Sequence, residues 1–277
     1  MRMDHRIAVL GAGNLGSALM RGLLRAGAVE AKQLTATVGA EEHARDLAKD
    51  LSIEVTTGNN AQVASQSNIV VLAVKPAKVR AVLEEIGGAL RPEQILLSLA
   101  AAVPITLIES WLPRPRAVFR AMPNLAMSVG QSATAISANA LATDEQRKVV
   151  KQVFDAVGVT VSVDDRQMHA VTALAGSGPG FVYWLMEKFT EAGAGLGLSA
   201  EDASALVRQT FLGASRLIQE TNADPAALRR QVTTPGGTTA AGIEVLENQA
   251  VQQALAAAIA AGTSRSEQLA ESFLKET

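Results

Sequence analysis

The chain has 277 residues, of which 48% are hydrophobic and 19% are charged, and its formal net charge at pH 7 is −2. This balance is typical of a globular protein, and at about 100 to 200 residues per domain the length predicts two domains. Acids and bases are mixed along the chain, so we expect neither nucleic acid nor a membrane surface as a partner. There is no cysteine and there are only three histidines. This composition excludes disulfides, thiolate metal sites and a cysteine nucleophile, and it predicts no metal site.

The start of the chain predicts an unprocessed, cytoplasmic protein. Residues 1–6 lead directly into a short apolar run, without the long apolar segment and small-residue cleavage site of a signal peptide. The longest apolar stretch, residues 95–108, is interrupted by polar residues and Pro104. Since this stretch is shorter than the ~20 residues needed to cross a bilayer, we expect no membrane span.

Short β-branched runs alternate with helical patterns up to about residue 163, which predicts βαβ units around a parallel sheet. The expected strands are residues 6–10, 34–38, 69–74, 95–99, 117–122, 133–137 and 159–163. Beyond Asp165 only long helical patterns rich in Ala and Leu follow, separated by Gly and Pro turns. The sequence thus predicts an α/β fold, with a Rossmann-type doubly wound parallel sheet in residues 1–165 and an all-α domain in residues 166–277.

A glycine-rich turn follows the first expected strand and opens a helical pattern. Its sequence is Gly11-Ala12-Gly13-Asn14-Leu15-Gly16. Gly11 permits the tight turn, Gly13 lets a pyrophosphate approach the backbone, and the helix presents free N–H groups to the phosphates. Because this motif lies between a strand and a helix at the start of an α/β domain, it predicts dinucleotide binding.

The end of the second expected strand bears on the choice of dinucleotide. An Asp or Glu there would bind the ribose 2′-hydroxyl of NAD, but this strand ends Thr37-Val38-Gly39. The lack of an acid favours NADP, although no arginine follows the strand and His43 and Arg45 lie farther along, on the next expected helix. We therefore expect NADPH to be preferred, with NADH as the alternative that the sequence leaves open.

Two further strand ends are expected at the same edge of the sheet. Ala73-Val74-Lys75-Pro76 ends one buried strand, and Leu99-Ala100-Ala101 ends the next. Open α/β sheets bind their ligands at the carboxyl ends of the strands. The small residues after Leu99 leave room for a nicotinamide ring, and Lys75 is either a contact to phosphate or ribose or an ordinary solvated charge.

The expected helical domain contains two glycine-rich helix entrances, Gly176-Ser177-Gly178-Pro179-Gly180 and Thr234-Pro235-Gly236-Gly237-Thr238-Thr239. Such entrances present unpaired backbone N–H groups together with hydroxyl side chains, which suits a small carboxylate. One of them alone would indicate only helix capping. Two in the same domain predict a pocket for an anionic substrate.

With these two turns the chain resembles the pyrroline-5-carboxylate reductase family over its whole length. The loop at residues 11–16, the turn at residues 73–76 and Arg120-Ala121-Met122-Pro123-Asn124 follow the order and spacing of that family. The resemblance implies an oxidoreductase acting on CH–NH bonds, which uses NAD(P)H to reduce 1-pyrroline-5-carboxylate to L-proline in the last step of proline biosynthesis. It also implies a helical dimerisation domain, a homodimer whose subunits share the substrate site, and further assembly of dimers into a homodecamer as an open alternative.

The resemblance also implies roles for individual residues. It places the cofactor on Leu10, Gly11, Ala12, Gly13, Asn14, Leu15, Asn60, Ala73, Val74, Lys75, Pro76, Leu99, Ala100 and Ala101. It places the substrate on Gly176, Ser177, Gly178, Pro179, Gly236, Gly237, Thr238 and Thr239. Thr239 would be the catalytic residue, with its hydroxyl on the ring nitrogen. The chain departs from the family pattern with Thr234 in place of serine, Ala102 in place of glycine and Leu125-Ala126 in place of Thr-Pro.

The available side chains favour an imine over a carbonyl substrate. Reduction of a ketone needs a proton donor, but the one tyrosine, Tyr183, lies in an apolar helical pattern and His169 is expected to be structural. An iminium arrives protonated, so the protein need only orient it, bind its carboxylate and offer one hydroxyl to its nitrogen. Thr239 suffices for this, while the ring size, five- or six-membered, stays open.

Two other functions are weighed against this one. A β-hydroxyacid dehydrogenase has a similar domain order but carries a lysine one turn after its glycine-rich helix start, where this chain has Phe181-Val182-Tyr183-Trp184. A non-catalytic NADP sensor would keep the pocket without turnover. An assay of cofactor oxidation distinguishes all three.

Overall fold

The computed structural model describes residues 3–275, which divide into two compact units. Unit 1 comprises residues 3–177 together with residues 261–275, and unit 2 comprises residues 178–260. In the described part of the chain no helix is long and apolar enough to cross a membrane.

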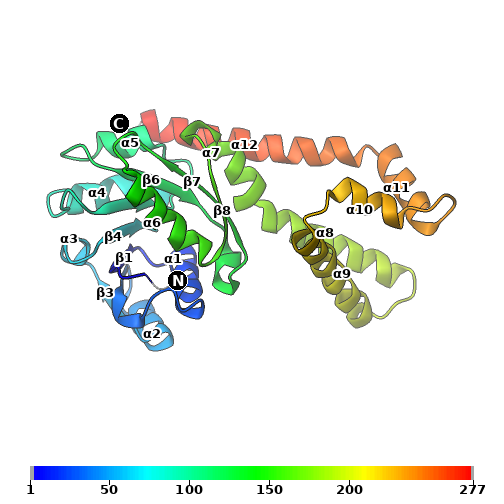
Figure 1. Ribbon diagram of the computed structural model, residues 1–277, viewed down its shortest axis with the longest axis horizontal. Coiled ribbons are helices and arrows are strands. Elements are labelled where there is room, and N and C mark those ends of the chain that lie inside the picture. Colours follow the sequence, from blue (N-terminus) through cyan, green and yellow to red (C-terminus); the bar gives the residue numbers. More distant parts are fainter. Residues whose placement is uncertain (1–2, 276–277) are drawn as a thin grey trace. The chain divides into compact units, whose positions relative to one another are not determined.

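Unit 1 is built on an eight-stranded sheet with the order β3-β2-β1-β4-β5-β6-β7-β8 (Figure 1). The strands are β1 (Ile7–Leu10), β2 (Leu34–Val38), β3 (Glu54–Thr57), β4 (Ile69–Leu72), β5 (Ile95–Ser98), β6 (Val118–Met122), β7 (Ser132–Ala138) and β8 (Gly158–Ser162). The first six strands are parallel in the 3-2-1-4-5-6 order of a Rossmann fold. The predicted α/β fold with a Rossmann-type sheet is confirmed.

Two features of the sheet differ from the prediction. Strand β3 was not expected, because Glu54-Val55-Thr56-Thr57 forms an exposed or half-buried edge strand without apolar alternation. Strand β7 pairs antiparallel with β6, since the nine residues 123–131 between them are too few for a helical crossover. The sheet is therefore parallel except at this one pair.

Helices cover both faces of the sheet. Those of unit 1, including 3-10 and π segments (η), are α1 (Asn14–Arg25), η1 (Ala31–Gln33), α2 (Glu41–Leu51), α3 (Asn60–Ser65), η2 (Pro76–Lys78), α4 (Val79–Ile86), α5 (Ile105–Ser110), η3 (Leu125–Val129), α6 (Asp144–Asp155), η4 (Asp165–Gln167), α7 (Met168–Val171) and η5 (Thr172–Gly176). Ile7 and Val9 pack in a core with α1, α2 and α6, whereas Ala8 and Leu10 pack in a second core with α3, α4 and α5. This double burial explains why β1 is apolar at every position.

The end of helix α12 (Val251–Lys275) belongs to unit 1 and supports the segment from α7 to η5. The buried hydroxyl of Ser266 lies 2.9 Å from His169 Nδ1. A Cβ on Gly262 would lie 3.1 Å from the Cβ of Ala173, so the two segments pack closely at this point. His169 is thus joined by a hydrogen bond to α12.

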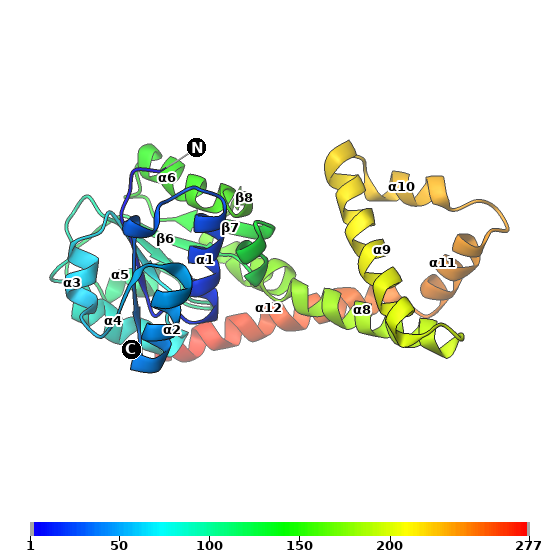
Figure 2. The ribbon, with the colours of Figure 1, turned by 90° about the horizontal axis from the view of Figure 1, so that it is seen from below.

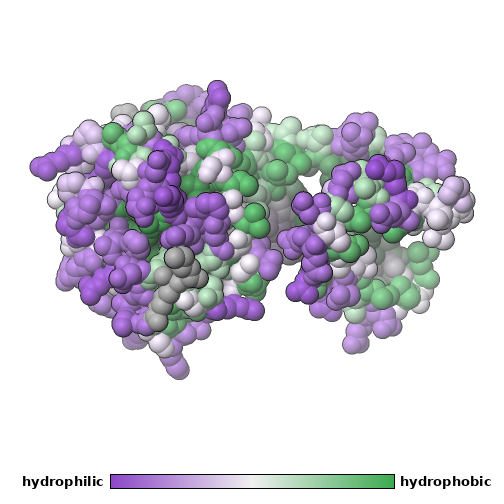
Figure 3. All heavy atoms as spheres, in the orientation of Figure 1, coloured by the Kyte–Doolittle hydropathy of each residue, from purple (hydrophilic) through white to green (hydrophobic). Residues whose placement is uncertain are grey.

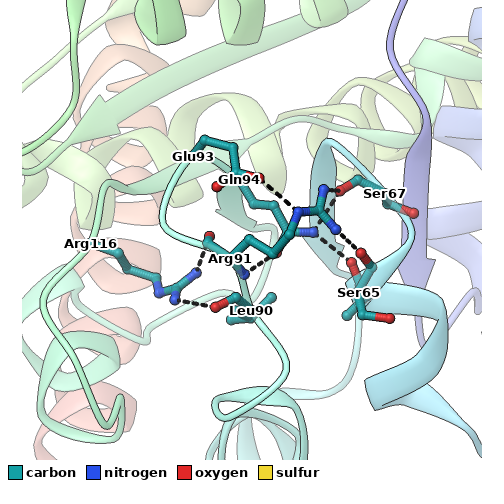
Figure 4. Close-up of polar contacts among 8 residues, drawn as sticks. Ser65, Ser67, Leu90, Arg91, Glu93, Gln94 and Arg116 are labelled. Carbon is teal, nitrogen blue, oxygen red and sulfur yellow. Dashed lines mark hydrogen bonds and ion pairs between the residues drawn. The ribbon is translucent and has the colours of Figure 1, made fainter.

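A polar network closes the edge of the sheet at which β4, β5 and β6 begin (Figure 4). The amide of Gln94, which is 1% exposed, donates to the carbonyl groups of Ala64 at 2.7 Å and Ser67 at 2.5 Å. Arg91 donates to the carbonyl groups of Ser65 and Ser67. These donors satisfy carbonyl groups at and just beyond the end of α3, at the edge opposite the glycine-rich loop.

Unit 2 consists of the helices α8 (Gly178–Gly195), α9 (Ala200–Thr221), α10 (Pro225–Val232), α11 (Thr238–Asn248) and the first part of α12. Helices α8 and α9 lie side by side (Figure 2), and the rings of Phe189 and Phe211 meet edge to face at 5.5 Å. Among residues 178–260, all of which are described, only Ala203 is buried. Large apolar side chains such as Trp184 and Leu206 are instead more than half exposed, and apolar atoms are visible on these helices in Figure 3.

Candidate active site

The glycine-rich loop after β1 has a backbone that only glycine adopts easily. Gly11 has φ +79°, and a Cβ there would lie 2.2 Å from Cγ1 of Val74 in the turn after β4. The N–H groups of Gly11 and Ala12 donate to the carbonyl of Thr37, at the end of β2, at 3.0 and 2.8 Å. The loop is therefore held between the carboxyl ends of β2 and β4.

The first turn of α1 provides an anion-binding site. Gly13 is the N-cap residue, has no capping side chain, and leaves open space where a Cβ would be. The first helical hydrogen bond runs from Ser17 N to Gly13 O at 2.9 Å, so within the described residues the N–H groups of Asn14, Leu15 and Gly16 have no acceptor. Three free N–H groups at the positive end of a helix suit a pyrophosphate.

A cavity of about 450 Å³ lies beside this loop. It is lined by Gly11, Gly13, Thr37, Val38, Gly39, His43, Gly58, Asn60, Ala73, Val74, Lys75, Lys78 and Val82. The structure thus brings together the predicted cofactor residues of the first loop, of α3 and of the turn after β4. The lining contains two lysines and one histidine and no carboxylate, which suits a ligand with several negative charges.

Asn60 connects α3 to the loop through Thr37. Its Oδ1 accepts from the Thr37 hydroxyl at 2.7 Å, and its Nδ2 donates to Glu85 at 2.7 Å. The Thr37 hydroxyl in turn accepts from Gly11 N at 3.2 Å. Asn60 therefore lines the cavity and also orients a side chain that holds the loop.

Seven lining residues were not assigned to the cofactor from the sequence: Thr37, Val38, Gly39, His43, Gly58, Lys78 and Val82. His43 was placed too far along its helix, yet its Nε2 lies 3.0 Å from the carbonyl of Ala12 in the glycine-rich loop. A sequence signal existed for it, because β1 and β2 of a Rossmann sheet are neighbours and the helices after them begin side by side.

The residues after β5 are packed more tightly than those around the cavity. Leu99 and Ala100 are buried, and Leu99 N donates to Leu72 O at 2.9 Å. Ala102 has φ +60°, the left-handed region that favours glycine, at the position where the family pattern has glycine. Leu99, Ala100 and Ala101 follow the strand beside β4 but do not line the 450 Å³ cavity. Their contact with the nicotinamide stays a prediction.

An ion pair between the buried Arg120 and the half-buried Asp165 fixes the helix that follows this turn. Asp165 accepts from Arg120 at 2.7 Å, from the Ser137 hydroxyl at 2.9 Å and from the N–H of Ile105, the first residue of α5, at 3.0 Å. Burial lowers the pKa of Arg120, and the charge and hydrogen bond of Asp165 oppose this shift. One carboxylate thus ties β6, β7 and the start of α5 together.

The first glycine-rich entrance begins beside the end of β6. Asn124 donates from Nδ2 to the carbonyl of Ala175 at 3.0 Å. A Cβ on Gly176 would lie 2.5 Å from Cε of Met122, so the tip of this methionine side chain packs closely against the glycine. Of the predicted substrate residues, Gly176 and Ser177 therefore belong to unit 1, at the carboxyl end of a strand, whereas Gly178 and Pro179 begin α8 of unit 2.

The second entrance, residues 234–239, lies in unit 2 and includes the first two residues of α11. Gly236 has φ +70°, and Gly237 N donates to Thr234 O at 2.9 Å. Gly237 is the N-cap residue without a capping side chain, and the first helical bond joins Ala241 N to its carbonyl at 3.2 Å. Within the described chain the N–H groups of residues 238–240 therefore lack acceptors, which suits a carboxylate.

Comparisons with known proteins agree with this arrangement. Residues 165–269 match the family model for pyrroline-5-carboxylate reductase dimerisation, and residues 6–102 match that for coenzyme F420-dependent NADP oxidoreductases. The chain is 41% identical to pyrroline-5-carboxylate reductase of Pseudomonas aeruginosa over 96% of its own length and 97% of the relative's. It is 36% identical to that of Methanosarcina acetivorans, with 96% and 98% covered.

Two solved structures are similar over nearly their whole length. The pyrroline-5-carboxylate reductase of Coxiella burnetii has a TM-score of 0.89 and 34% identity, with 96% of this chain and 99% of that chain covered. The Plasmodium falciparum pyrroline carboxylate reductase, solved with NADP bound, has a TM-score of 0.87 and 25% identity, with 98% and 100% covered.

Proposed function

Because this chain belongs to the pyrroline-5-carboxylate reductase family, we propose that it catalyses NAD(P)H-dependent reduction of 1-pyrroline-5-carboxylate to L-proline. The observation that carries the proposal is the uncapped first turn of α1 beside a cavity without carboxylates, in a chain 41% identical to a relative of that name. This reaction is the last step of proline biosynthesis.

We propose NADPH as the preferred cofactor, with NADH as the alternative. Lys75 and Lys78 line the cavity, and β2 ends without an acid that would repel a 2′-phosphate. The N–H groups of residues 14–16 would hold the pyrophosphate, and the turn after β5 would lie against the nicotinamide. The cofactor supplies the hydride when bound, and the protein's task is to orient the two reactants.

The substrate would be bound through its carboxylate. Free N–H groups at residues 238–240, together with Gly236 and Gly237, are suited to that group. The entrance at residues 176–179 is the other segment that we propose to bind the substrate. The hydroxyl of Thr239 would bind the ring nitrogen. Hydride addition to the C=N carbon sends the double-bond electron pair to a nitrogen that is already protonated, so no further proton donor is required.

The test follows the oxidation of NADPH, and separately of NADH, with five- and six-membered cyclic imino acids. Thr239→Ala should lower kcat by about ten- to a hundredfold and leave cofactor affinity unchanged, because it removes one catalytic hydrogen bond. Thr233→Ala is the matched control, since within the described residues the Thr233 hydroxyl bonds only to the Arg229 carbonyl of the preceding helix α10, at 2.6 Å. Oxidation of a 3-hydroxy acid instead would indicate a dehydrogenase, and tight cofactor binding without turnover would indicate a sensor.

We also propose that the chain works as a homodimer through its helical domain. Unit 2 has almost no buried side chains of its own, and apolar surfaces of this extent are typical of subunit interfaces. Light scattering at assay concentration should give a dimer or a multiple of it, and a monomer would contradict the proposal. Assembly into a homodecamer, the functional division into residues 1–165 and 166–277, and a cytoplasmic location stay predictions.

A further inference from the structure

We propose that His43 selects between the two nicotinamide dinucleotides. Its protonated imidazole would bind the 2′-phosphate of NADP(H), and its neutral imidazole would bind the ribose 2′-hydroxyl of NAD(H). The inference rests on the part of the proposed function that places a dinucleotide in the cavity after β1, β2 and β4. It assigns cofactor choice to a residue one helical turn beyond the strand end.

The end of β2 provides no side chain for this choice. The Thr37 hydroxyl already donates to Asn60 at 2.7 Å and accepts from Gly11 N at 3.2 Å, and Val38 is buried. Gly39 has no side chain, and nothing lies within 4 Å of the place of its missing Cβ. The space beside Gly39 is therefore open, and the group that recognises the 2′ position must come from elsewhere in the lining.

His43 occupies the suitable place. It lies in the first turn of α2, lines the same cavity as Gly39, and reaches the phosphate-binding loop through its Nε2, 3.0 Å from Ala12 O. Since a carbonyl oxygen only accepts hydrogen bonds, Nε2 must be the donor in this contact. The other ring nitrogen, Nδ1, has no hydrogen-bond partner in the described part of the chain and is available to a ligand.

This geometry makes the ligand preference depend on the charge of the ring. In the neutral ring with hydrogen on Nε2, Nδ1 carries a lone pair and accepts from the ribose 2′-hydroxyl of NAD(H). A phosphate dianion has no proton to donate, so the same lone pair repels it. In the protonated ring both nitrogens donate, and Nδ1–H forms a charge-assisted hydrogen bond with the 2′-phosphate of NADP(H).

Several charged side chains surround His43. Helix α2 contributes Glu41, Glu42 and Asp46, and the Glu41 carboxylate accepts a hydrogen bond from the Thr57 hydroxyl. Lys75 and Lys78 lie across the cavity. Arg21 of α1 and Asp50 of α2 form an ion pair nearby. Side chains of these types ordinarily keep their charge between about pH 6.5 and 8.5, whereas imidazole loses its charge over about pH 5 to 8. The lysines attract phosphate throughout this range, and loss of the second phosphate proton strengthens that attraction as the pH rises. A fall in the preference for the bisphosphate with rising pH is therefore assigned to His43.

The experiment uses calorimetry to measure the binding of adenosine 2′,5′-bisphosphate and of adenosine 5′-phosphate to the full-length protein. The measurements are made at about pH 6.5 and 8.5, where a phosphate group with a second pKa near 6 is largely dianionic. In the unmodified protein the ratio of the two affinities should fall about tenfold over this range as one charge-assisted hydrogen bond is lost. In His43→Gln, whose amide can still donate to Ala12 O, the ratio should not change with pH. His5→Gln, at the other end of β1, is the matched control and should keep the full pH dependence.

A second variant guards against a merely structural effect. His43→Lys carries a permanent charge, so its preference for the bisphosphate should be high at both pH values. The inference would be overturned if the affinity ratio of the unmodified protein did not change with pH, or if His43→Gln kept the same pH dependence. It would also be overturned if Lys78→Gln lost the pH dependence and His43→Gln did not. Because the readout is binding, absence of imine reduction would refute the proposed function and leave this result standing.

Discussion

Alanine substitutions at Gly11 and Gly13 separate the folding role of the glycine-rich loop from its binding role. In Gly11→Ala the new Cβ would lie 2.2 Å from Val74 Cγ1 and 3.0 Å from Val74 Cα, at a residue with φ +79°. The left-handed conformation costs an alanine about 1 to 2 kcal/mol, and overpacking against the half-buried Val74 costs about 1 to 3 kcal/mol. Alanine also lowers the conformational entropy of the unfolded chain, which raises the stability of the folded protein by about 0.4 to 1 kcal/mol. The expected loss of stability is therefore about 1 to 5 kcal/mol.

Gly13→Ala should behave differently. Gly13 has φ −75°, which alanine adopts without strain, and no atom lies within 4 Å of the added Cβ. The lower entropy of the unfolded chain stabilises this variant by less than about 1 kcal/mol, and the poorer N-cap destabilises it by less than about 1 kcal/mol. The free energy of unfolding should therefore hardly change. Gly13 lines the cavity, however, and a methyl group there would occupy the space through which a pyrophosphate approaches the free N–H groups.

Two measurements check this pair of variants. Urea unfolding monitored by circular dichroism should show the large loss of stability only for Gly11→Ala. Calorimetric titration with NADPH should show at least about a tenfold loss of affinity for Gly13→Ala at full stability, which corresponds to ~1.4 kcal/mol. Parental NADPH affinity in Gly13→Ala would refute the assignment of this loop as the phosphate site, and parental stability in Gly11→Ala would refute the packing argument.

Three further substitutions test other parts of unit 1. Asp165→Ala leaves Arg120, which is 3% exposed, without its carboxylate and should cost about 3 to 5 kcal/mol in urea unfolding. Gln94→Leu removes two donors from the network at the opposite edge of the sheet and should cost about 1 to 3 kcal/mol, with NADPH affinity by calorimetry unchanged. Ala102→Gly relieves a left-handed residue at φ +60° and should raise the stability by up to about 1 kcal/mol, seen as a higher Tm.

The sequence was sufficient to predict seven of the eight strands of unit 1. The buried strands are rich in apolar residues, and β8, which is an exposed edge strand, contains the β-branched run Val159-Thr160-Val161. The remaining strand, β3, shows the limit of that signal. Its residues Glu54-Val55-Thr56-Thr57 are exposed or half-buried and pair only with β2. An edge strand of this kind is stabilised by the neighbour it pairs with, and four residues of sequence do not reveal that neighbour.

The cofactor cavity was predictable in outline but not in its charged residues. The glycine-rich loop and the turn after β4 follow from motifs, since both are tied to strand ends. His43 and Lys78 reach the same cavity only because α2 and η2 begin beside the loop, which depends on the sheet order rather than on local sequence. A charged residue within one helical turn of a strand end in a Rossmann sheet should therefore be weighed as a cofactor contact, even when the strand end itself is neutral.

The two units differ in how they can be stabilised, and this difference links binding to assembly. Unit 1 has two apolar cores and contains the cofactor loop with its cavity. The cofactor loop therefore does not need a second chain to be stable. Unit 2 carries the turn at residues 234–239, yet Ala203 is its one buried residue, all of residues 178–260 being described. Helices that are apolar on most sides gain their free energy only when another surface covers them. The order of the substrate turn should therefore depend on the dimer, whereas the order of the cofactor loop should not.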